Sequence, residues 1–201
     1  MIAIIDYGAG NLQSVEKAFR FLGCEVKVTG SMEGLLCSDA AVLPGVGSFG
    51  DSMDCLMQSG LIDPIKEFIG SGRPFLGICL GLQLLFEESE ESPGVKGLGV
   101  LKGKICKIPA ESGLKIPHIG WNSLDVRKND GLFQGLPENP YVYFVHSYYL
   151  KAEDRDVVSS QTQYGVDIDA SVQRKNLFAT QFHPEKSGDT GLRILKAFSE
   201  L

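Results

Sequence analysis

The feature that most constrains the fold is the stretch Arg73–Phe86, which reads RPFLGICLGLQLLF. Its apolar run from Pro74 to Ile78 is typical of a buried strand in a parallel sheet. Leucine and phenylalanine then recur at three- and four-residue spacing, as they do on one face of a helix. The stretch therefore predicts a central strand, a sharp turn at Cys79 and a helix.

Glycines on both sides of Cys79, Gly77 and Gly81, make this turn a candidate nucleophile elbow. A tight strand-to-helix turn brings backbone against backbone, and glycine has no side chain to clash there. At a helix N-terminus the dipole favours the thiolate, and the amide of Leu80 could donate to a developing oxyanion. The alternative is a small buried cysteine in a glycine-rich turn. The strand–turn–helix context favours the nucleophile.

The first 86 residues alternate between strand and helix patterns. Strands are expected at Ile2–Asp6, Glu25–Thr29 and Ala40–Leu43, and a helix at Leu12–Leu22. Asp63 and Pro64 suit the N-cap and the first residue of a further helix. The alternation predicts an α/β fold with a central, mostly parallel sheet flanked by helices, in a flavodoxin-like arrangement.

The pattern changes after Pro93, where strand-like segments follow one another with turn residues between them. They are Gly97–Ile108, Ile116–Val126, Tyr141–Tyr149, Val157–Tyr164, Ile168–Arg174 and Leu177–Phe182. These segments predict an antiparallel extension of the sheet. A helix is expected at Gly188–Phe198. Since there is no internal repeat or long linker, residues 1–201 are expected to form one domain.

The composition excludes several classes of protein. The net charge is −6 and the charged residues are interspersed, so no nucleic-acid partner is expected. No signal peptide is expected, because the apolar run within Met1–Asp6 is short and has no basic leader. No apolar run is long enough to span a membrane, so no membrane partner is expected. The five cysteines are odd in number and lack Cys-x-x-Cys spacing. We therefore expect no zinc site, no disulfide framework and a cytoplasmic location. No cofactor is expected.

A second glycine pattern, GVGSFG at Gly45–Gly50, matches the G-x-G-x-x-G dinucleotide fingerprint. However, Pro44 interrupts the junction, and a helix start at Asp63 occupies the place of the expected strand-end acid. Gly8 and Gly10 are better placed, but Gln13 replaces the third glycine. Dinucleotide binding is therefore the less favoured interpretation. The alternative is a flexible backbone whose amides face an active site.

A nucleophilic cysteine needs a base, and the chain has three histidines. His183 follows an apolar strand and lies two residues before Glu185, so an extended segment would place both side chains on the same side. Glu185 could then orient the imidazole. The alternative is a strand-end histidine beside a solvated glutamate. His146 is expected to be half-buried in an aromatic strand and His118 has no carboxylate neighbour, so neither is assigned as the base.

Together, Gly77–Gln83 and the late segment His183–Glu185 resemble the class I (triad) glutamine amidotransferases. Pro44–Gly47 resembles the oxyanion segment of that family, and the resemblance covers the whole chain. One small departure is Leu82, where methionine is common. More narrowly, four segments resemble the glutaminase subunits of imidazole glycerol phosphate synthases, in histidine biosynthesis: Asp6–Leu12, Pro117–Asn122, Phe144–Tyr148 and His183–Ser187.

The resemblance implies a glutaminase mechanism. Cys79 would attack the side-chain amide of glutamine and form a thioester, His183 would carry the proton to the departing ammonia, and Glu185 would orient His183. The oxyanion would be held by the amide of Leu80 with that of Val46 or Gly47. Substrate contacts are implied for Gln83, Glu91, Ser147 and Tyr148; for Glu91 the alternative is a solvated acidic helix end.

The resemblance also implies a partner. Ammonia released into water would be protonated and lost as a nucleophile, so a closed path to a second site is needed. The family partner is a (β/α)8-barrel cyclase subunit, which forms a heterodimer and makes imidazole glycerol phosphate and an aminoimidazole carboxamide ribonucleotide. The interface candidates are Asn11, Trp121, Asn122, Tyr143 and Lys186. The alternatives are a core aromatic for Trp121 and a solvated side chain for Lys186.

Two other functions remain open on the residues alone. One is a stand-alone Cys–His–Glu hydrolase of the same fold, such as a peptidase or γ-glutamyl hydrolase, which would work without a partner. The other is a non-catalytic binding subunit that has kept the fold. The intact set of Cys79, His183 and Glu185 argues against the second.

Overall fold

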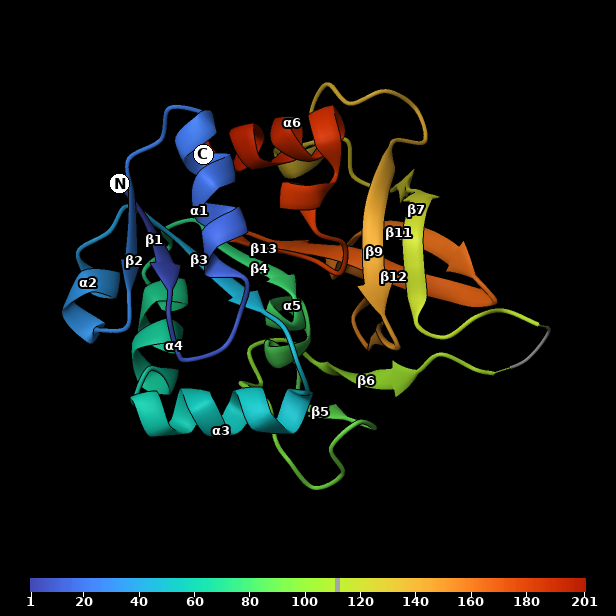
Figure 1. The fold of residues 1–201 in the computed structure, drawn as a ribbon, viewed down its shortest axis with the longest axis horizontal. Helices are drawn as coiled ribbons and strands as arrows, with labels where there is room; N and C mark the ends of the chain where they lie inside the picture. Colours follow the sequence, from blue (N-terminus) through green and yellow to red (C-terminus); the bar gives the residue numbers. More distant parts are fainter. Residues whose placement is uncertain (111–112) are drawn as a thin grey trace.

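The computed structural model describes residues 1–110 and 113–201, and its centre is an eleven-stranded mixed sheet (Figure 1). The main path through this sheet has the strand order β2-β1-β3-β4-β13-β12-β10-β6-β5, and β11 and β8 continue from β12. The first five strands of this path run parallel: β2 (Val26–Thr29), β1 (Ile2–Ile5), β3 (Ala40–Gly45), β4 (Phe75–Cys79) and β13 (Leu177–Thr180). The α/β fold predicted from the alternating pattern is confirmed.

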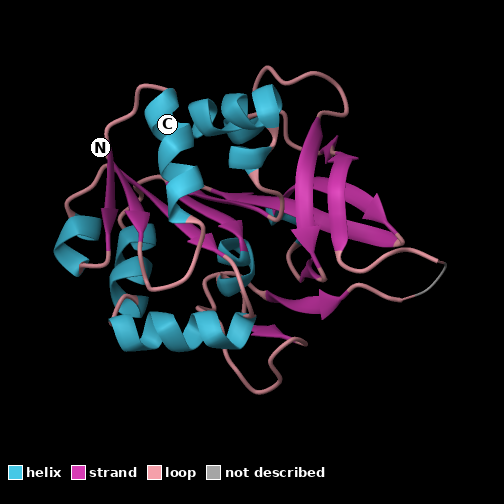
Figure 2. Ribbon diagram, viewed as in Figure 1, coloured by secondary structure: helices cyan, strands magenta, loops and turns pink. Residues whose placement is uncertain are grey.

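Helices cover both faces of the parallel strands (Figures 1 and 2). One face carries α1 (Leu12–Phe21) and α6 (Gly188–Ser199); the other carries α2 (Met32–Leu36), α3 (Phe49–Ser59), α4 (Ile62–Gly70) and α5 (Leu80–Leu84). Alternate residues of each strand enter opposite cores, as the two-residue period of a strand requires. Ile4 packs with Phe19 of α1 on one face, whereas Ala3 and Ile5 pack with the α3 and α4 side chains on the other.

The second half of the chain is largely antiparallel. Its strands in the main sheet are β5 (Glu88–Ser89), β6 (Gly103–Lys107), β8 (Asp125–Val126), β10 (Tyr148–Ala152), β11 (Val158–Tyr164) and β12 (Val166–Arg174). A separate antiparallel pair joins β7 (His118–Ser123) to β9 (Tyr141–His146), and single 3-10 turns lie at η1 (Gly131–Phe133), η2 (Arg155–Val157) and η3 (Pro184–Lys186). Figure 1 shows the β7–β9 pair standing beside the end of the main sheet.

Three expectations about these elements were wrong in detail. Helix α4 begins at Ile62 after Leu61, so Asp63 is not the N-cap and Pro64 is the third helical residue, where its missing N–H costs no hydrogen bond. In 97–102 the chain is not a strand, because the amides of Leu98 and Val100 bond to the carbonyls of Leu84 and Leu85 at the end of α5.

The third difference concerns β13. Leu177–Thr180 is expected in the antiparallel extension, but it lies between β12, to which it is antiparallel, and β4, to which it is parallel. The strand therefore joins the two halves of the sheet. Its end also lies next to the end of β4, where the nucleophile was expected.

Within the described residues, no helix combines the length and the apolar character needed to cross a membrane.

Candidate active site

The predicted nucleophile lies at the junction of β4 and α5. Cys79 is the last residue of the strand and has φ 55° and ψ −109°, a backbone conformation that residues with a side chain rarely adopt. A Cβ on Gly77 would lie 2.8 Å from the carbonyl oxygen of Gly81, and one on Gly81 would lie 1.9 Å from that of Leu43. Both positions therefore require glycine, and the strained turn at Cys79 is a sign of a functional residue.

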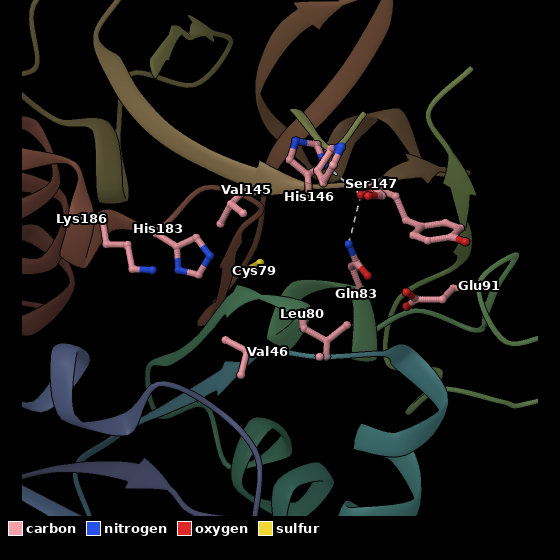
Figure 3. Close-up of a pocket in the computed structure, with 13 residues that line it drawn as sticks. Val46, Cys79, Leu80, Gln83, Glu91, Val145, His146, Ser147, His183 and Lys186 are labelled. Carbon is pink, nitrogen blue, oxygen red and sulfur yellow. Dashed lines mark hydrogen bonds between the residues drawn. The ribbon is translucent and has the colours of Figure 1, made fainter. Parts of the chain in front are cut away.

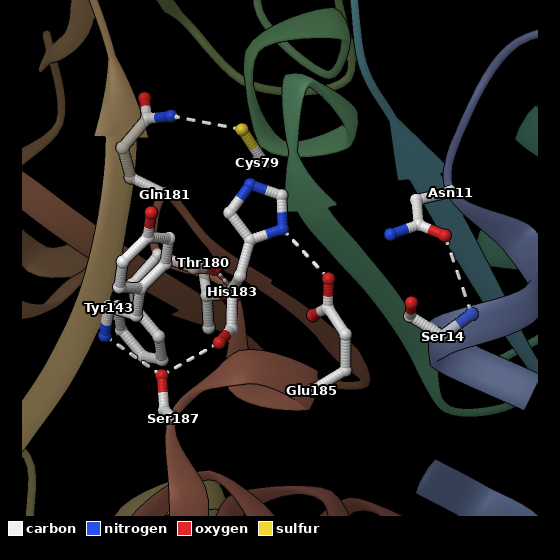
Figure 4. Close-up of polar contacts among 10 residues, drawn as sticks. Asn11, Ser14, Cys79, Tyr143, Thr180, Gln181, His183, Glu185 and Ser187 are labelled. Carbon is white, nitrogen blue, oxygen red and sulfur yellow. Dashed lines mark hydrogen bonds and ion pairs between the residues drawn. The ribbon is translucent and has the colours of Figure 1, made fainter. Parts of the chain in front are cut away.

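His183 follows β13 and lies at the same edge of the sheet as Cys79, because β13 and β4 are parallel neighbours with Thr180 opposite Ile78. Figure 4 shows its ring between the sulfur of Cys79 and the carboxylate of Glu185. Nδ1 of His183 is 2.8 Å from Oε1 of Glu185, and both side chains are almost fully buried. The structure therefore brings together all three residues of the expected triad.

The extended backbone expected from His183 to Glu185 was wrong, although the two side chains do meet. Glu185 lies in the 3-10 turn η3, which begins at Pro184, and only His183 before it is extended. Proline suits the first position of such a turn for two reasons. Its fixed φ is close to the helical value, and an N–H at this position would have no acceptor within the turn. The turn folds Glu185 back under the imidazole.

The electrostatics of His183 favour the imidazolium. Burial by itself lowers the pKa, but contacts with Cys79 and Glu185 outweigh burial and raise the pKa of His183 to about 10. At neutral pH the ring therefore carries the proton that a leaving group needs. The same positive charge stabilises the thiolate form of the neighbouring sulfur.

A further residue of this segment, Ser187, is not among the site residues expected from the sequence. Its hydroxyl donates to the carbonyl of His183 at 2.7 Å and accepts from the amide of Tyr143 at 2.9 Å. The amide of His183 donates in turn to the carbonyl of Tyr143 at 3.0 Å. Ser187 thus ties the base to β9. Ser187 is the last residue of the segment His183–Ser187, which resembles the family, so the sequence offered a hint. Only the fold shows which groups its hydroxyl contacts.

The other two histidines form a buried pair on β7 and β9. Nδ1 of His118 is 3.0 Å from Nε2 of His146, and Nδ1 of His146 is 2.9 Å from the carbonyl oxygen of Tyr148. Burial lowers the pKa of His118 to about 4 and that of His146 to about 3, so both are neutral at neutral pH. Neither contacts Cys79 by a hydrogen bond, which agrees with leaving them out of the triad.

A cavity of about 310 Å³ opens in front of Cys79 (Figure 3). It is lined by the expected oxyanion and substrate residues together with the nucleophile and the base: Val46, Gly47, Cys79, Leu80, Gln83, Glu91, Ser147, Tyr148 and His183. Pro117, Val145, His146 and Lys186 complete the wall. This volume falls at the small end of the usual range for ligand sites, which suits a small substrate.

Gln83 and Glu91 lie at the end of the cavity opposite Lys186 (Figure 3). Nε2 of Gln83 donates to the carbonyl of Tyr148 at 3.2 Å, so its amide oxygen remains as an acceptor. Oε2 of Glu91 accepts from the amide of Phe49 at 2.8 Å. This end therefore presents oxygen acceptors and a negative charge, which suit a positively charged group.

The glycine pattern at Gly45–Gly50 does not form a phosphate cradle. Ser48 caps α3, the amide of Phe49 bonds to the carboxylate of Glu91, and the amide of Gly50 bonds to Oγ of Ser92 at 3.0 Å. A phosphate would have to displace a carboxylate from these amides. Within the described parts of the chain, no three His, Cys, Asp or Glu side chains are grouped closely enough to hold a metal ion.

The interface candidates lie in different settings. Trp121 is 55% exposed, so it is not a core aromatic. Its ring lies edge-on to that of Tyr143, with the ring centroids 6.2 Å apart. Lys186 is exposed and lines the cavity. Asn11 caps α1 by accepting from the amide of Ser14 at 3.4 Å, and Asn122 donates to the carbonyl of Gln163 at 3.0 Å. Both asparagines therefore have contacts within the chain.

Comparison with known proteins agrees with this geometry. The class-I glutamine amidotransferase family matches residues 3–200, and the chain therefore belongs to that family. The chain is 48% identical over 201 residues to the imidazole glycerol phosphate synthase subunit HisH of Caldanaerobacter subterraneus, covering 100% of this chain and 98% of the relative. It is 50% identical over 201 residues to the protein of that name from Methanothermobacter thermautotrophicus, covering 100% of this chain and 98% of the relative.

Solved structures show the same fold at much lower identity. A crystal structure of a glutamine amidotransferase has a TM-score of 0.76 and 21% identity, covering 98% of each chain. A chain in the structure of PurLQS from Thermotoga maritima has a TM-score of 0.78 and 21% identity, covering 99% of this chain and 97% of that one.

Proposed function

We propose that this chain is the glutaminase subunit of an imidazole glycerol phosphate synthase, folded as one domain over residues 1–201. The observation that carries the proposal is the buried Cys79–His183–Glu185 set at the base of a cavity of about 310 Å³. The choice among synthases rests on relatives of that name that are 48–50% identical over the full chain. The substrate is glutamine and the products of this subunit are glutamate and ammonia.

The chemistry proceeds in two halves. The thiolate of Cys79 attacks the side-chain amide carbon of glutamine, and the carbonyl electrons move onto oxygen. When the tetrahedral species collapses, the C–N bond breaks and His183 delivers its proton to the departing nitrogen. Water, deprotonated by the neutral His183, then attacks the thioester, and the sulfur leaves with its electron pair. Glu185 keeps the imidazole oriented in both halves.

Two groups of amides suit the oxyanion. The amide of Leu80, the first residue of α5, has no acceptor within the helix and points from the same turn as Cys79. Val46 and Gly47 lie across the cavity, and Gly47 has φ +95°. We assign the oxyanion to Leu80 together with one of these two amides.

The substrate orientation follows from the charges at the two ends of the cavity. The α-ammonium of glutamine suits the acceptor end formed by Glu91 and the amide oxygen of Gln83. The side-chain amide then reaches Cys79, and the backbone of Ser147 and Tyr148 flanks the bound molecule. Replacement of the ammonium by hydrogen should therefore abolish productive binding.

The partner is a (β/α)8-barrel cyclase subunit, which docks over the exposed side of β7 and receives ammonia through a closed path. Strand β7 buries His118 but exposes Ile119 (59%) and Trp121 (55%). Two large apolar side chains on one exposed strand face are typical of an interaction surface. Tyr143, whose ring lies edge-on to that of Trp121, is a further candidate, together with Asn11, Asn122 and Lys186.

We also propose a cytoplasmic location. All five cysteines are free, and Cys37 is exposed. Free exposed thiols are typical of a reducing compartment.

The test is glutamate release from glutamine, measured with and without the barrel subunit and its nucleotide ligand. Activity that requires the partner and disappears in Cys79→Ser supports the proposal. Equal activity without the partner would identify a stand-alone hydrolase, and no glutamate with any synthase partner would leave only a binding role. Cys106→Ser is the matched control, because Cys106 is a buried free cysteine on β6 outside the cavity.

A further inference from the structure

A residue with no role so far lies directly beside the nucleophile. Gln181 follows β13, is fully buried, and its Nε2 is 3.8 Å from the sulfur of Cys79. Figure 4 shows its amide approaching the sulfur from a different side than the ring of His183. A distance of this size is within the range for a hydrogen bond to sulfur, whose radius exceeds that of oxygen.

The orientation of the Gln181 amide is determined by its neighbours. The carbonyl of Tyr148 can only accept, so the atom of Gln83 that lies 3.2 Å from it must be the donor Nε2. The same Nε2 is 3.0 Å from Gln181, which must therefore present its oxygen there. The amide nitrogen of Gln181 is then the atom that faces Cys79.

The carbonyl of Tyr148 is itself held from the other side. Nδ1–H of His146 donates to it at 2.9 Å, which leaves Nε2 of His146 as the acceptor for Nδ1–H of His118 at 3.0 Å. The ring of His118 is stacked on that of Tyr164, with centroids 3.9 Å apart. A chain of directed hydrogen bonds thus runs from the β7–β9 pair to the sulfur.

We propose that Gln181 is a further catalytic residue, whose side-chain amide donates a hydrogen bond to the sulfur of Cys79 and stabilises its thiolate. This inference rests on the proposed role of Cys79 as nucleophile. A donor stabilises an anionic sulfur more than the neutral thioester sulfur. It therefore raises the thiolate population before attack, and assists the sulfur as it leaves when water hydrolyses the thioester.

The test is the pH profile of Cys79 alkylation by iodoacetamide in the full-length protein, followed by mass spectrometry of the Cys79 peptide. Gln181→Met keeps the length of the side chain but cannot donate. In this variant, we expect the pH at which the alkylation rate is half of its maximum to rise by about one unit. Gln181→Glu has the same shape but an anionic carboxylate, and should raise this pH further.

Steady-state glutaminase assays with the partner give the second readout. Gln181→Met should lower kcat about 10- to 100-fold with a smaller change in KM, because the amide nitrogen contacts the sulfur and Gln83 keeps its hydrogen bond to the carbonyl of Tyr148. The matched control is Gln163→Met, since Gln163 is an exposed glutamine whose amide bonds to Asp167 outside the cavity. It should leave both the alkylation profile and kcat unchanged.

The outcomes separate this inference from the proposed function. An unchanged alkylation midpoint in folded Gln181→Met overturns the role of Gln181, even if its kcat falls. If Cys79 of the wild type does not react with iodoacetamide faster than Cys37, the nucleophile assignment itself fails. If Gln181→Glu does not fold, the Gln181→Met profile alone decides.

Discussion

The nucleophile and the base lie at the ends of neighbouring parallel strands, β4 and β13, yet they are held in different ways. Cys79 is held by backbone packing, because Gly77 and Gly81 let helix α5 approach strands β4 and β3 more closely than any side chain would allow. His183 is held by polar contacts to Glu185 and Ser187. Steric constraint therefore sets the position of the nucleophile, and directed hydrogen bonds set the position of the base.

The two halves of the site should therefore lose function in different ways. Steric constraint is lost by adding atoms, and the penalty appears as lower stability of the whole fold. Directed hydrogen bonds are lost by removing a donor or acceptor, and the penalty appears first in the chemistry. Substitutions in each half therefore distinguish a loss of stability from a loss of rate.

The largest effect is expected for Glu185→Gln on the polar side. The neutral amide keeps the size of the side chain but removes the charge that stabilises the imidazolium. We expect kcat for glutamine to fall about 100- to 10,000-fold with the partner present, and the pKa of His183 to fall. Steady-state kinetics and NMR titration of the imidazole measure the two. A kcat within about threefold of wild type would show that Glu185 does not orient the base.

Gly81→Ala should be the most damaging change on the steric side. The added Cβ would lie 1.9 Å from the carbonyl oxygen of Leu43, which is backbone and cannot move aside. We expect the free energy of unfolding in urea to fall by about 3 kcal/mol or more. Gly70→Ala is the matched control, because a Cβ there meets nothing within 4 Å, and it should change stability by less than about 1 kcal/mol. Similar losses in both variants would contradict the steric account.

Ser187→Ala separates positioning from folding on the polar side. The change leaves the amide of Tyr143 and one contact of the His183 carbonyl without a partner in a buried place. We expect a stability loss of about 1–3 kcal/mol and a roughly tenfold lower kcat. Ser187→Thr keeps the hydroxyl and should recover most of the rate. Equal rates for Ser187→Ala and Ser187→Thr would remove Ser187 from the list of positioning residues.

The smallest effect is a pH dependence of stability from the second half of the chain. His118 and His146 have pKa values of about 4 and about 3 when folded, below the value of about 6.5 expected when unfolded. The unfolded chain therefore binds more protons as the pH falls through 6.5, and stability is lost. The raised pKa of His183 acts in the opposite direction, since its contribution is complete below about pH 6.5 and disappears as the pH rises toward 10.

We expect a net loss of roughly 1–2 kcal/mol between about pH 7 and about pH 5.5, measured by urea unfolding. His118→Phe should reduce this loss, because an apolar ring suits the stack between Tyr164 and Phe144 and does not titrate. An identical slope in the variant would show that His118 is not the source.

Much of the site was predictable because its signals are local. The glycines around Cys79 and the pair His183 and Glu185 are close in sequence and have clear chemical roles. The sequence also indicates the strand-like segments of the second half, but it does not indicate that β13 pairs in parallel with β4. A strand's own pattern tells that it is buried, but not which strands lie beside it.

The rest was decided by contacts between distant segments. Gln181 and Gln83 are 98 residues apart, and Tyr143 and Ser187 are 44 apart. No periodicity or spacing links such pairs, because their meeting depends on the order of strands in the sheet.

By itself, then, the sequence determined the alternating α/β pattern and the sharp strand-to-helix turn at Cys79, since backbone sterics and side-chain periodicity act over a few residues. Only the tertiary structure decided that β13 runs beside β4, which brings His183 to the sulfur, and that Gln181 faces it. Hydrogen bonds are directional and short, so they form only after the sheet has brought the distant segments together.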